Sequence, residues 1–294
     1  MLTVACFGHY GGTTGTLKRG TWDAATLPWP TDGQSSVAVD GVGRIGAKGG
    51  QRPVPIASVT KVMTAYVVLR DHPLRGDEQG PSIEVDQVAA DEALSASEST
   101  VRVRQGQRFT QRQLLELMLI PSGNNIARLL ARWDADTQKV FVSKMNDAAT
   151  ALGMEHTTYT GASGIEASTV STSDDQLKLA RTVMKDRVLR EIVAKPSTTV
   201  PGLPGPIVNT NKLLRKPGVV GLKTGSSTPA GGNLMWAATA NVGGRERLVL
   251  GVVLHQRAGT SAQQGLEAVL ERSAKLIDGV RSALLRDAPT AQLA

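Results

Sequence analysis

Hydrophobic and polar residues follow a strand-like pattern at the two ends of the chain. Near the start, residues 36–39 and 44–48 are two short runs, and the Asp-Gly-Val-Gly sequence at 40–43 between them favours a hairpin turn. In the last third, three further runs predict strands at residues 219–224, 234–242 and 248–254. Gly243 and Gly244 join the last two of these strands. A hairpin of two strands is marginally stable alone, so we expect all five strands to form one antiparallel sheet.

The middle of the chain predicts helices from its apolar content and from residues that favour helix ends. Thr110-x-x-Gln113 and Ser173-x-x-Gln176 both have the spacing of a capping box, and Gly153 is a stop signal. The expected helices are residues 58–70, 110–119, 124–133, 137–152 and 173–185. Residues 196–206 are rich in Pro and Gly and predict a loop.

The last predicted helix, residues 262–285, has one apolar stripe. Its apolar residues recur at 266, 269, 270, 277, 280 and 284, which is the spacing of an amphipathic helix. Such a stripe suits either a membrane surface or the face of a sheet, and covering a sheet is the commoner role.

These elements together predict an α+β fold in which an antiparallel five-stranded sheet is flanked by helices and carries an inserted helical lobe. We assign residues 35–56 and 218–294 to the sheet lobe and residues from about 58 to 195 to the helical lobe. A cleft between two such lobes is a common place for chemistry. Residues 1–34 lack periodicity and are rich in Gly, Thr, Pro and Trp, so we interpret them as a weakly structured leader or linker.

Composition narrows the classes of function. The chain has 294 residues, 40% of them hydrophobic, and a formal net charge of +7, which excludes disorder. Its single cysteine excludes a disulfide framework, and its four histidines form no ligand pair, so we expect no metal and no cofactor. Basic residues are scattered among few aromatics, which argues against nucleic-acid binding. No apolar run is long enough to span a bilayer, and residues 1–7 are not a convincing signal peptide, so no membrane anchor is visible.

One motif in the first hairpin is misleading. Residues 41–46 match the dinucleotide-binding pattern G-x-G-x-x-G. That pattern binds a pyrophosphate only where a helix begins and presents its N–H groups. The sequence that follows, through Gly49, Gly50 and Pro53, does not favour a helix, so we interpret residues 41–46 as part of a hairpin and expect no oxidoreductase.

Three short polar motifs occur once each. Ser58-x-x-Lys61 places a hydroxyl and an amine on one face of a helix, where a neutral lysine can serve as base for a serine nucleophile. Ser122-x-Asn124 lies in a turn between two helices and offers a hydroxyl and an amide, although Asn124 alone also fits a helix cap.

The third motif, Lys223-Thr224-Gly225, ends a predicted strand. Its amine and hydroxyl suit a carboxylate, and its glycine allows close approach of a ligand backbone. Each of the three motifs is weak alone. Their occurrence in this order is the published signature of penicillin-binding proteins and class A β-lactamases.

The chain resembles the low-molecular-mass penicillin-binding proteins that are serine D-alanyl-D-alanine carboxypeptidases, with a β-lactamase/DD-peptidase-like fold. The resemblance runs from about Ser35 to the C-terminal helix. Besides the three motifs it includes the segments at 56–65, 121–125, 152–165, 209–214 and 223–234. It implies an enzyme of the cell envelope or a secreted one. The substrate would be a peptidoglycan stem peptide ending in D-Ala-D-Ala, and β-lactams would bind covalently.

The resemblance also implies a role for each motif residue. Ser58 is the expected nucleophile and Lys61 its base, while Ser122 and Lys223 handle protons at the leaving group. Asn124 holds the substrate amide and Thr224 binds the terminal carboxylate. The backbone N–H groups of Ser58 and Ser226 form the oxyanion hole, which stabilises the tetrahedral intermediate. Gly225, between Thr224 and Ser226, completes the expected substrate-binding set.

Three alternatives remain open. A DD-transpeptidase has the same motifs, because water and amine acceptors are not distinguished by them. A class A β-lactamase needs a glutamate with an asparagine four residues later, and none of Glu155, Glu166 and Glu191 has one. A non-catalytic binding protein of this fold is disfavoured because every nucleophile and base position is intact. One departure from the family is that Ala262-Gln263 stands where many members carry a carboxylate-binding arginine, with Arg257 a few residues earlier.

Overall fold

A six-stranded antiparallel sheet joins segments from the two ends of the chain. The computed structural model describes residues 24–242 and 244–286. The sheet runs β10-β11-β12-β1-β2, and β9 also pairs with β11. The strands are β1 (Gln34–Val39), β2 (Gly43–Lys48), β9 (Val219–Gly221), β10 (Thr224–Ser227), β11 (Gly231–Val242) and β12 (Arg245–Gln256).

The sheet agrees with the predicted fold class and adds one detail. The strand expected at residues 219–224 is divided into β9 and β10, because the backbone leaves the extended region at Gly221 (φ 132°) and Leu222 (φ 84°). The first hairpin is confirmed, since β1 and β2 pair with Val37 opposite Gly46. No helix follows the glycine pattern of this hairpin within the described chain, so the dinucleotide-binding interpretation is excluded.

Along the sequence, the remaining helices and strands lie between β2 and β9, apart from η1, which precedes β1, and α8, which follows β12. The other strands form two-residue or three-residue pairs: β3 (Val54–Pro55) with β6 (Val170–Ser171), β4 (Ser82–Glu84) with β5 (Arg108–Thr110), and β7 (Ser197–Thr198) with β8 (Ile207–Val208). The 3₁₀ helices are η1 (Ala24–Thr26), η2 (Ala57–Thr60) and η3 (Lys212–Arg215). The α-helices are α1 (Lys61–Asp71), α2 (Gln87–Glu92), α3 (Gln111–Leu119), α4 (Asn124–Ala135), α5 (Gln138–Ala151), α6 (Ser173–Val183), α7 (Arg187–Val193) and α8 (Ala262–Arg286).

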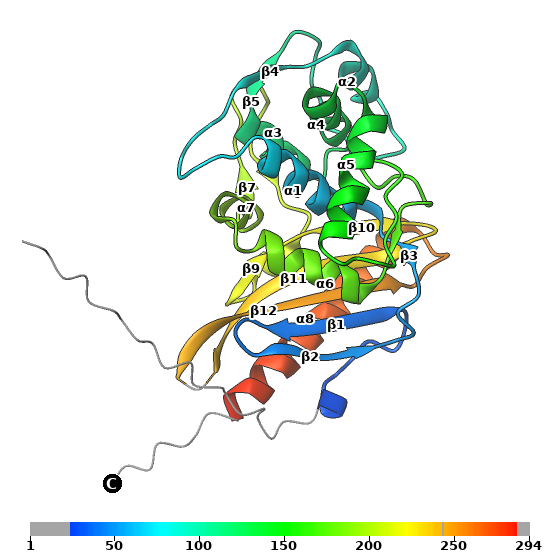
Figure 1. Cartoon of the computed structure of the whole chain (residues 1–294), viewed down its shortest axis with the longest axis vertical. Coiled ribbons are helices and arrows are strands. Elements are labelled where there is room, and N and C mark those ends of the chain that lie inside the picture. The colour runs from blue at the N-terminus through cyan, green and yellow to red at the C-terminus, as the bar shows by residue number, and fades with distance from the viewer. Residues whose placement is uncertain (1–23, 243, 287–294) are drawn as a thin grey trace, which may run out of the picture.

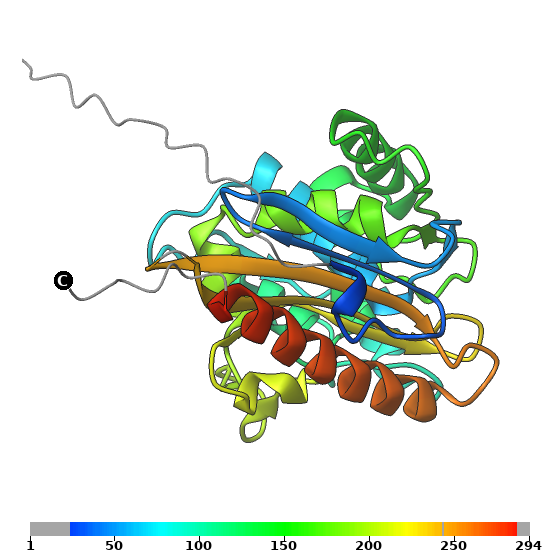
Figure 2. The ribbon, with the colours of Figure 1, turned by 90° about the horizontal axis from the view of Figure 1, so that it is seen from below.

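Helix α8 covers one face of the sheet, and α6 with the helical lobe covers the other (Figures 1 and 2). Val269, Ile277 and Val280 of α8 are at most 1% exposed and share a core with Trp236 of β11. The apolar stripe of α8 therefore packs on the sheet, which confirms core packing over a membrane-surface role. No helix of the described chain is long and apolar enough to cross a membrane.

The sheet lobe includes packed residues that precede its predicted start at Ser35. Leu27 is only 6% exposed and belongs to the core under α8. A Cβ added at Gly279 of α8 would lie 2.3 Å from Pro28 Cδ, so this glycine lets the incoming segment touch the helix. The predicted weakly structured leader is thus wrong from Leu27 to Gln34, while residues 1–23 lie outside the described residues.

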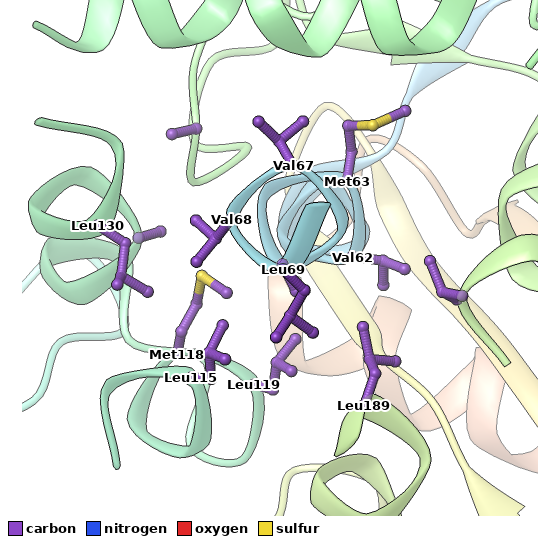
Figure 3. Close-up of a cluster of buried hydrophobic side chains, with 14 of the residues drawn as sticks. Val62, Met63, Val67, Val68, Leu69, Leu115, Met118, Leu119, Leu130 and Leu189 are labelled. Atoms are coloured by element: carbon purple, nitrogen blue, oxygen red, sulfur yellow. The ribbon is translucent and has the colours of Figure 1, made fainter. Parts of the chain in front are cut away.

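Helix α1 is the central element of the helical lobe. Val62, Met63, Val67 and Val68 are fully buried, so this helix is covered on all sides. Figure 3 shows α1 end-on among side chains that include Leu115, Met118 and Leu119 of α3, Leu130 of α4 and Leu189 of α7. This packing holds the N-terminal end of α1 in place, and that end carries the first polar motif.

Helix-end predictions were right at α3 and wrong at α6. Thr110 and Gln113 form the complete capping box that begins α3. At α6 the cap is Thr172, whose hydroxyl accepts a hydrogen bond from Asp175 N at 3.1 Å. Ser173 is instead buried, and its hydroxyl lies 2.9 Å from Ser36 Oγ in β1. The tertiary contact with the sheet thus moves the helix start by one residue.

Candidate active site

Ser58 and Lys61 meet because a 3₁₀ turn precedes α1. Residues three apart in a 3₁₀ helix lie one above the other, and η2 brings Ser58 under the first residue of α1. Lys61 Nζ lies 2.8 Å from Ser58 Oγ. Ser58 is half-buried, whereas Lys61 is fully buried, so the hydroxyl remains open to a substrate while the amine does not contact water.

The amine of Lys61 is enclosed by oxygen atoms of three other residues. Besides Ser58 Oγ, its Nζ lies 2.5 Å from Asn124 Oδ1 and 2.8 Å from the Ser163 carbonyl oxygen. Burial, followed by the positive charges of Lys223 and Arg128, holds the pKa of Lys61 well below its ordinary value. These influences favour the neutral form of the amine next to a serine hydroxyl.

The second motif forms a tight turn between α3 and α4. Ser122 has φ 70° and is 5% exposed, and Gly123 is needed because a Cβ there would lie 2.9 Å from Leu117 O. Gly123 is the N-cap residue of α4 and makes no side-chain cap hydrogen bond. Asn124 therefore does not cap the helix. Its amide accepts from Lys61 and donates through Nδ2 to Glu98 Oε2 at 2.6 Å.

Two charged residues that the sequence analysis did not select support Asn124. Arg128 lies one helical turn after Asn124 and pairs with Glu98 at 2.9 Å and Glu92 at 2.8 Å. Burial acts to raise the pKa of Glu98, but hydrogen bonds from Arg128 and Asn124 and the charge of Arg128 hold it below its ordinary value. Glu98 therefore remains an anion that fixes the Asn124 amide. The i,i+4 spacing of Asn124 and Arg128 places both on one face of α4, but no local spacing links either residue to Glu98.

Lys223 occupies the break between β9 and β10. Its backbone exchanges two hydrogen bonds of 3.0 Å with Met235 of β11, and its Nζ donates to the Thr224 carbonyl oxygen at 2.9 Å. Lys223 is 1% exposed, and this burial lowers its pKa to about 7. Because its charge lowers the pKa of Lys61, the first and third motifs are close enough to interact electrostatically.

The buried Lys223 predicts a pH-dependent stability. Its folded-state pKa of about 7 lies below that of the unfolded chain. Between pH 7 and 10 the unfolded chain therefore binds more protons, and the free energy of unfolding rises with pH. Lys223→Met removes this contribution. Between pH 7 and 10 we therefore expect the free energy of unfolding of wild type to rise by up to ~4 kcal/mol relative to that of Lys223→Met. Urea unfolding of both proteins measures this difference. A difference that is constant across this range would contradict the lowered pKa of the buried Lys223.

Strand β10 is the sheet edge that faces η2, the turn that carries Ser58. Lys223 and Met235 are a hydrogen-bonded pair, so alternation along an antiparallel ladder directs the N–H of Ser226, three residues later, away from β11. A Cβ at Gly225 would lie 2.8 Å from the backbone nitrogens of Ser58 and Val59. Glycine is therefore required for β10 to run against η2. The Thr224 hydroxyl lies 2.6 Å from the Thr210 hydroxyl.

Backbone strain occurs at all three motifs. Ala57, Ser122 and Leu222 have φ values of 46°, 70° and 84°, in the left-handed region that non-glycine residues seldom occupy. Ala57 and Leu222 directly precede Ser58 and Lys223. Such strain is kept where surrounding contacts determine the backbone, and it is common at functional sites.

The structure brings together most of the residues selected from the sequence. Lys61 links Ser58 to Asn124, Gly225 touches the Ser58 backbone, and the charge of Lys223 reaches Lys61. The side chain of Ser122 forms no hydrogen bond with another described residue of the motifs. Three additional residues at this place are Ser163, whose carbonyl accepts from Lys61, Thr210, and Glu166, whose charge acts on Lys61. No group of three His, Cys, Asp or Glu residues suited to a metal occurs in residues 24–242 and 244–286.

Known proteins share this sequence and this arrangement. The D-alanyl-D-alanine carboxypeptidase family, peptidase family S11, matches residues 27–257. A D-alanyl-D-alanine carboxypeptidase of Mycobacterium tuberculosis is 36% identical over 206 residues, which cover 68% of this chain and 66% of the relative. A D-alanyl-D-alanine carboxypeptidase of Streptomyces sp. strain K15 is 34% identical over 213 residues, which cover 67% of this chain and 71% of the relative. A D-alanyl-D-alanine endopeptidase of Pseudomonas aeruginosa is 34% identical over 64% of this chain, and the match spans 60% of that protein.

Solved structures agree with the sequence comparison. The crystal structure of the Streptomyces K15 DD-transpeptidase has a TM-score of 0.71 at 28% identity and covers 83% of this chain and 95% of its own. The D-alanyl-D-alanine carboxypeptidase structure from Mycobacterium tuberculosis has a TM-score of 0.70 at 29% identity and covers 85% of this chain and 90% of its own. The family match spans well over half of the chain and includes all three motifs. The chain therefore belongs to the D-alanyl-D-alanine carboxypeptidase family.

Proposed function

We propose that the protein is a serine D-alanyl-D-alanine carboxypeptidase that acts on peptidoglycan stem peptides through an acyl-enzyme. The observation that carries this proposal is the set of contacts around Lys61 Nζ. A neutral lysine amine has two N–H groups and one lone pair. Asn124 Oδ1 and the Ser163 carbonyl oxygen can only accept hydrogen bonds, so they use both N–H groups. The lone pair is left for the Ser58 hydroxyl at 2.8 Å, which makes Lys61 its base.

Acylation then follows from the positions of these groups. Ser58 Oγ attacks the carbonyl carbon of the penultimate D-Ala while its proton passes to Lys61. The negative charge on the carbonyl oxygen is stabilised by the Ser58 and Ser226 N–H groups, because Ser226 N–H is directed away from β11 and Gly225 lies against the Ser58 backbone. Each such donor contributes ~2.7–4 kcal/mol in other acyl-transfer enzymes.

The leaving group and its carboxylate lie on the β10 side of Ser58 in this proposal. The C–N bond breaks, and the departing D-Ala nitrogen takes up the proton that Lys61 accepted, which is relayed through Ser122 and Lys223. Thr224, with the adjacent Thr210 hydroxyl at 2.6 Å, binds the terminal carboxylate. An anion there favours the protonated form of Lys223, whose pKa of about 7 lets it exchange protons near neutral pH. Water finally cleaves the Ser58 ester and releases the shortened peptide.

Transpeptidation is the second candidate function. The structure of a DD-transpeptidase matches this fold with a TM-score of 0.71, and this observation favours an amine as an alternative acyl acceptor. Both reactions share the acylation step, so the geometry around Ser58 supports them equally.

The experiment that separates the two functions uses diacetyl-Lys-D-Ala-D-Ala with and without glycylglycine as amine acceptor. We expect free D-Ala and the shortened peptide without acceptor, because a carboxypeptidase transfers its acyl group to water. Chromatography with mass spectrometry detects both products. Product that forms only with glycylglycine would assign the protein as a transpeptidase, and absence of D-Ala under both conditions would refute the DD-peptidase proposal.

The proposed substrate also implies a location. Peptidoglycan is an extracytoplasmic polymer, so we propose that the protein works in the cell envelope or as a secreted enzyme. Its proposed partners are stem peptides ending in D-Ala-D-Ala and β-lactams, with no role for nucleic acid.

A further inference from the structure

A groove of about 770 Å³ begins beside the second motif and is not used by the proposed acylation step. Its inner end is lined by Glu98 and Pro121, which respectively bond to Asn124 and precede Ser122. Its far wall contains Leu203. The volume falls within the range of ~300–1,000 Å³ that small ligands fill.

Two arginines on one extended segment give the groove its charge. Val101 and Val103 are 7% and 5% exposed, whereas Arg102 and Arg104 between and after them are exposed. Both arginines line the groove, together with Val103. The segment is fixed to α4, because Asn125 Oδ1 accepts from Val101 N at 3.0 Å. The backbone that carries the two arginines is therefore anchored beside the turn of the second motif.

Neither guanidinium group is neutralised by the described chain. Arg102 and Arg104 are exposed and form no ion pair with any described residue, whereas Arg112, Arg128 and Arg132 of this lobe do. Among the described residues that line the groove, Glu98 is the only acidic one, and it is already bound to Arg128 and Asn124. The groove thus presents two free cations beside apolar surface that includes Leu94, which is 85% exposed.

The substrate half that enters this groove follows from the position of the leaving group. Strand β10 and Lys223 take the departing D-Ala, so the acyl half of the peptide extends from Ser58 in the other direction, past Asn124 and Glu98. The residue before the two D-Ala residues is the first whose side chain can extend along the groove. Its chemistry has to match two arginines and an aliphatic wall.

We propose that Arg102 and Arg104 bind a carboxylate at the end of a long aliphatic side chain in the acyl half of the substrate. This inference rests on the proposed function and specifies the substrate class of the same site. Guanidinium groups bind carboxylates through paired, charge-assisted hydrogen bonds, and the stem of the side chain covers apolar surface. A neutral side chain gains only the apolar contact.

The test compares two peptides that differ by one carboxylate. Nα,Nε-diacetyl-Lys-D-Ala-D-Ala has a neutral side chain, and Nα-acetyl-Nε-succinyl-Lys-D-Ala-D-Ala carries a carboxylate at its end. Calorimetric titration into Ser58→Ala measures binding without turnover. We expect the succinylated peptide to bind about three- to tenfold more tightly, with a smaller ratio at 0.5 M NaCl. Equal dissociation constants would overturn the proposal.

Matched variants assign the preference to the groove. Arg102→Glu/Arg104→Glu, in the same Ser58→Ala background, is expected to reverse the ratio to favour the neutral peptide, and Arg102→Gln/Arg104→Gln to bring it to about one. Lys139→Glu/Arg245→Glu changes the net charge as much as the glutamate pair, on exposed residues that do not line the groove, and is expected to keep the wild-type ratio. If the Lys139→Glu/Arg245→Glu variant also lost the preference for the succinylated peptide, the preference would come from the net charge of the protein. That result would refute the proposed carboxylate site in the groove.

Turnover by the unmodified enzyme separates this inference from the proposed function. If D-Ala is released from the neutral peptide and both peptides bind equally, the carboxylate-binding role of the groove is refuted and the carboxypeptidase activity is supported. No release from either peptide with tighter binding of the succinylated peptide refutes the carboxypeptidase and supports the groove.

Discussion

Ser58→Ala is expected to abolish the covalent adduct that a fluorescent penicillin forms with the protein. A β-lactam carbonyl is an acyl donor, and the adduct is an ester on the attacking hydroxyl. Ser58 is half-open to solvent and has the Lys61 amine, whose pKa is lowered by burial, 2.8 Å from its Oγ. The Ser122 hydroxyl forms no such contact with an amine of the described chain. Gel fluorescence and the intact mass of the protein measure the adduct.

The control for this prediction is a serine outside the site. Ser143 is exposed on α5 and hydrogen-bonded only to the backbone of Lys139, so Ser143→Ala is expected to label like wild type. Thermal unfolding of both variants verifies that they are folded. Labelling that persists in folded Ser58→Ala would remove Ser58 from the nucleophile role.

Lys61→Ala is expected to slow acylation by roughly 10⁴- to 10⁶-fold, because the loss of either the nucleophile or its base costs nearly as much rate as the loss of both. The substitution also leaves Asn124 Oδ1 and the Ser163 carbonyl without their donor. A second variant, Lys61→Met, keeps the volume of the buried side chain and is expected to show the same loss. The second-order rate constant of penicillin acylation is the measurement.

The pH dependence distinguishes a base from a structural lysine. Only the neutral amine accepts a proton, and burial with the charges of Lys223 and Arg128 lowers the pKa of Lys61. Wild-type acylation is therefore expected to fall as the pH drops through that lowered pKa, and this fall lies at a lower pH than the titration of an ordinary lysine. Lys185→Ala, at an exposed position two residues after the end of α6, is the control and keeps both rate and profile. Acylation near the wild-type rate by either Lys61 variant would refute the base assignment.

The prediction of elements from the sequence was accurate where local signals act alone. The Asp-Gly-Val-Gly turn, the Thr110–Gln113 capping box and the apolar stripe of α8 each depend on neighbouring residues, and each was confirmed. Predictions failed where a residue makes contacts with a segment that is distant in the sequence. Ser173 bonds to Ser36 in β1 and leaves the cap to Thr172, and Leu27 packs against α8 rather than belonging to a loose leader.

The sequence by itself determined which chemical groups the site contains. The three motifs supply three hydroxyls, two amines, an amide and a glycine, and their order along the chain indicates the family. Helical spacing is sufficient to pair Ser58 with Lys61, because a distance of three residues is fixed by local backbone geometry.

Only the tertiary structure decided what those groups do. The pKa of Lys61 depends on burial and on charges from Lys223 and Arg128, which are 162 and 67 positions away in the printed sequence. Asn124 faces the lysine instead of capping its helix because Glu98 holds its other end. Electrostatic and desolvation energies depend on distances in space, and a sequence fixes these only after the helical lobe has closed onto the edge of the sheet.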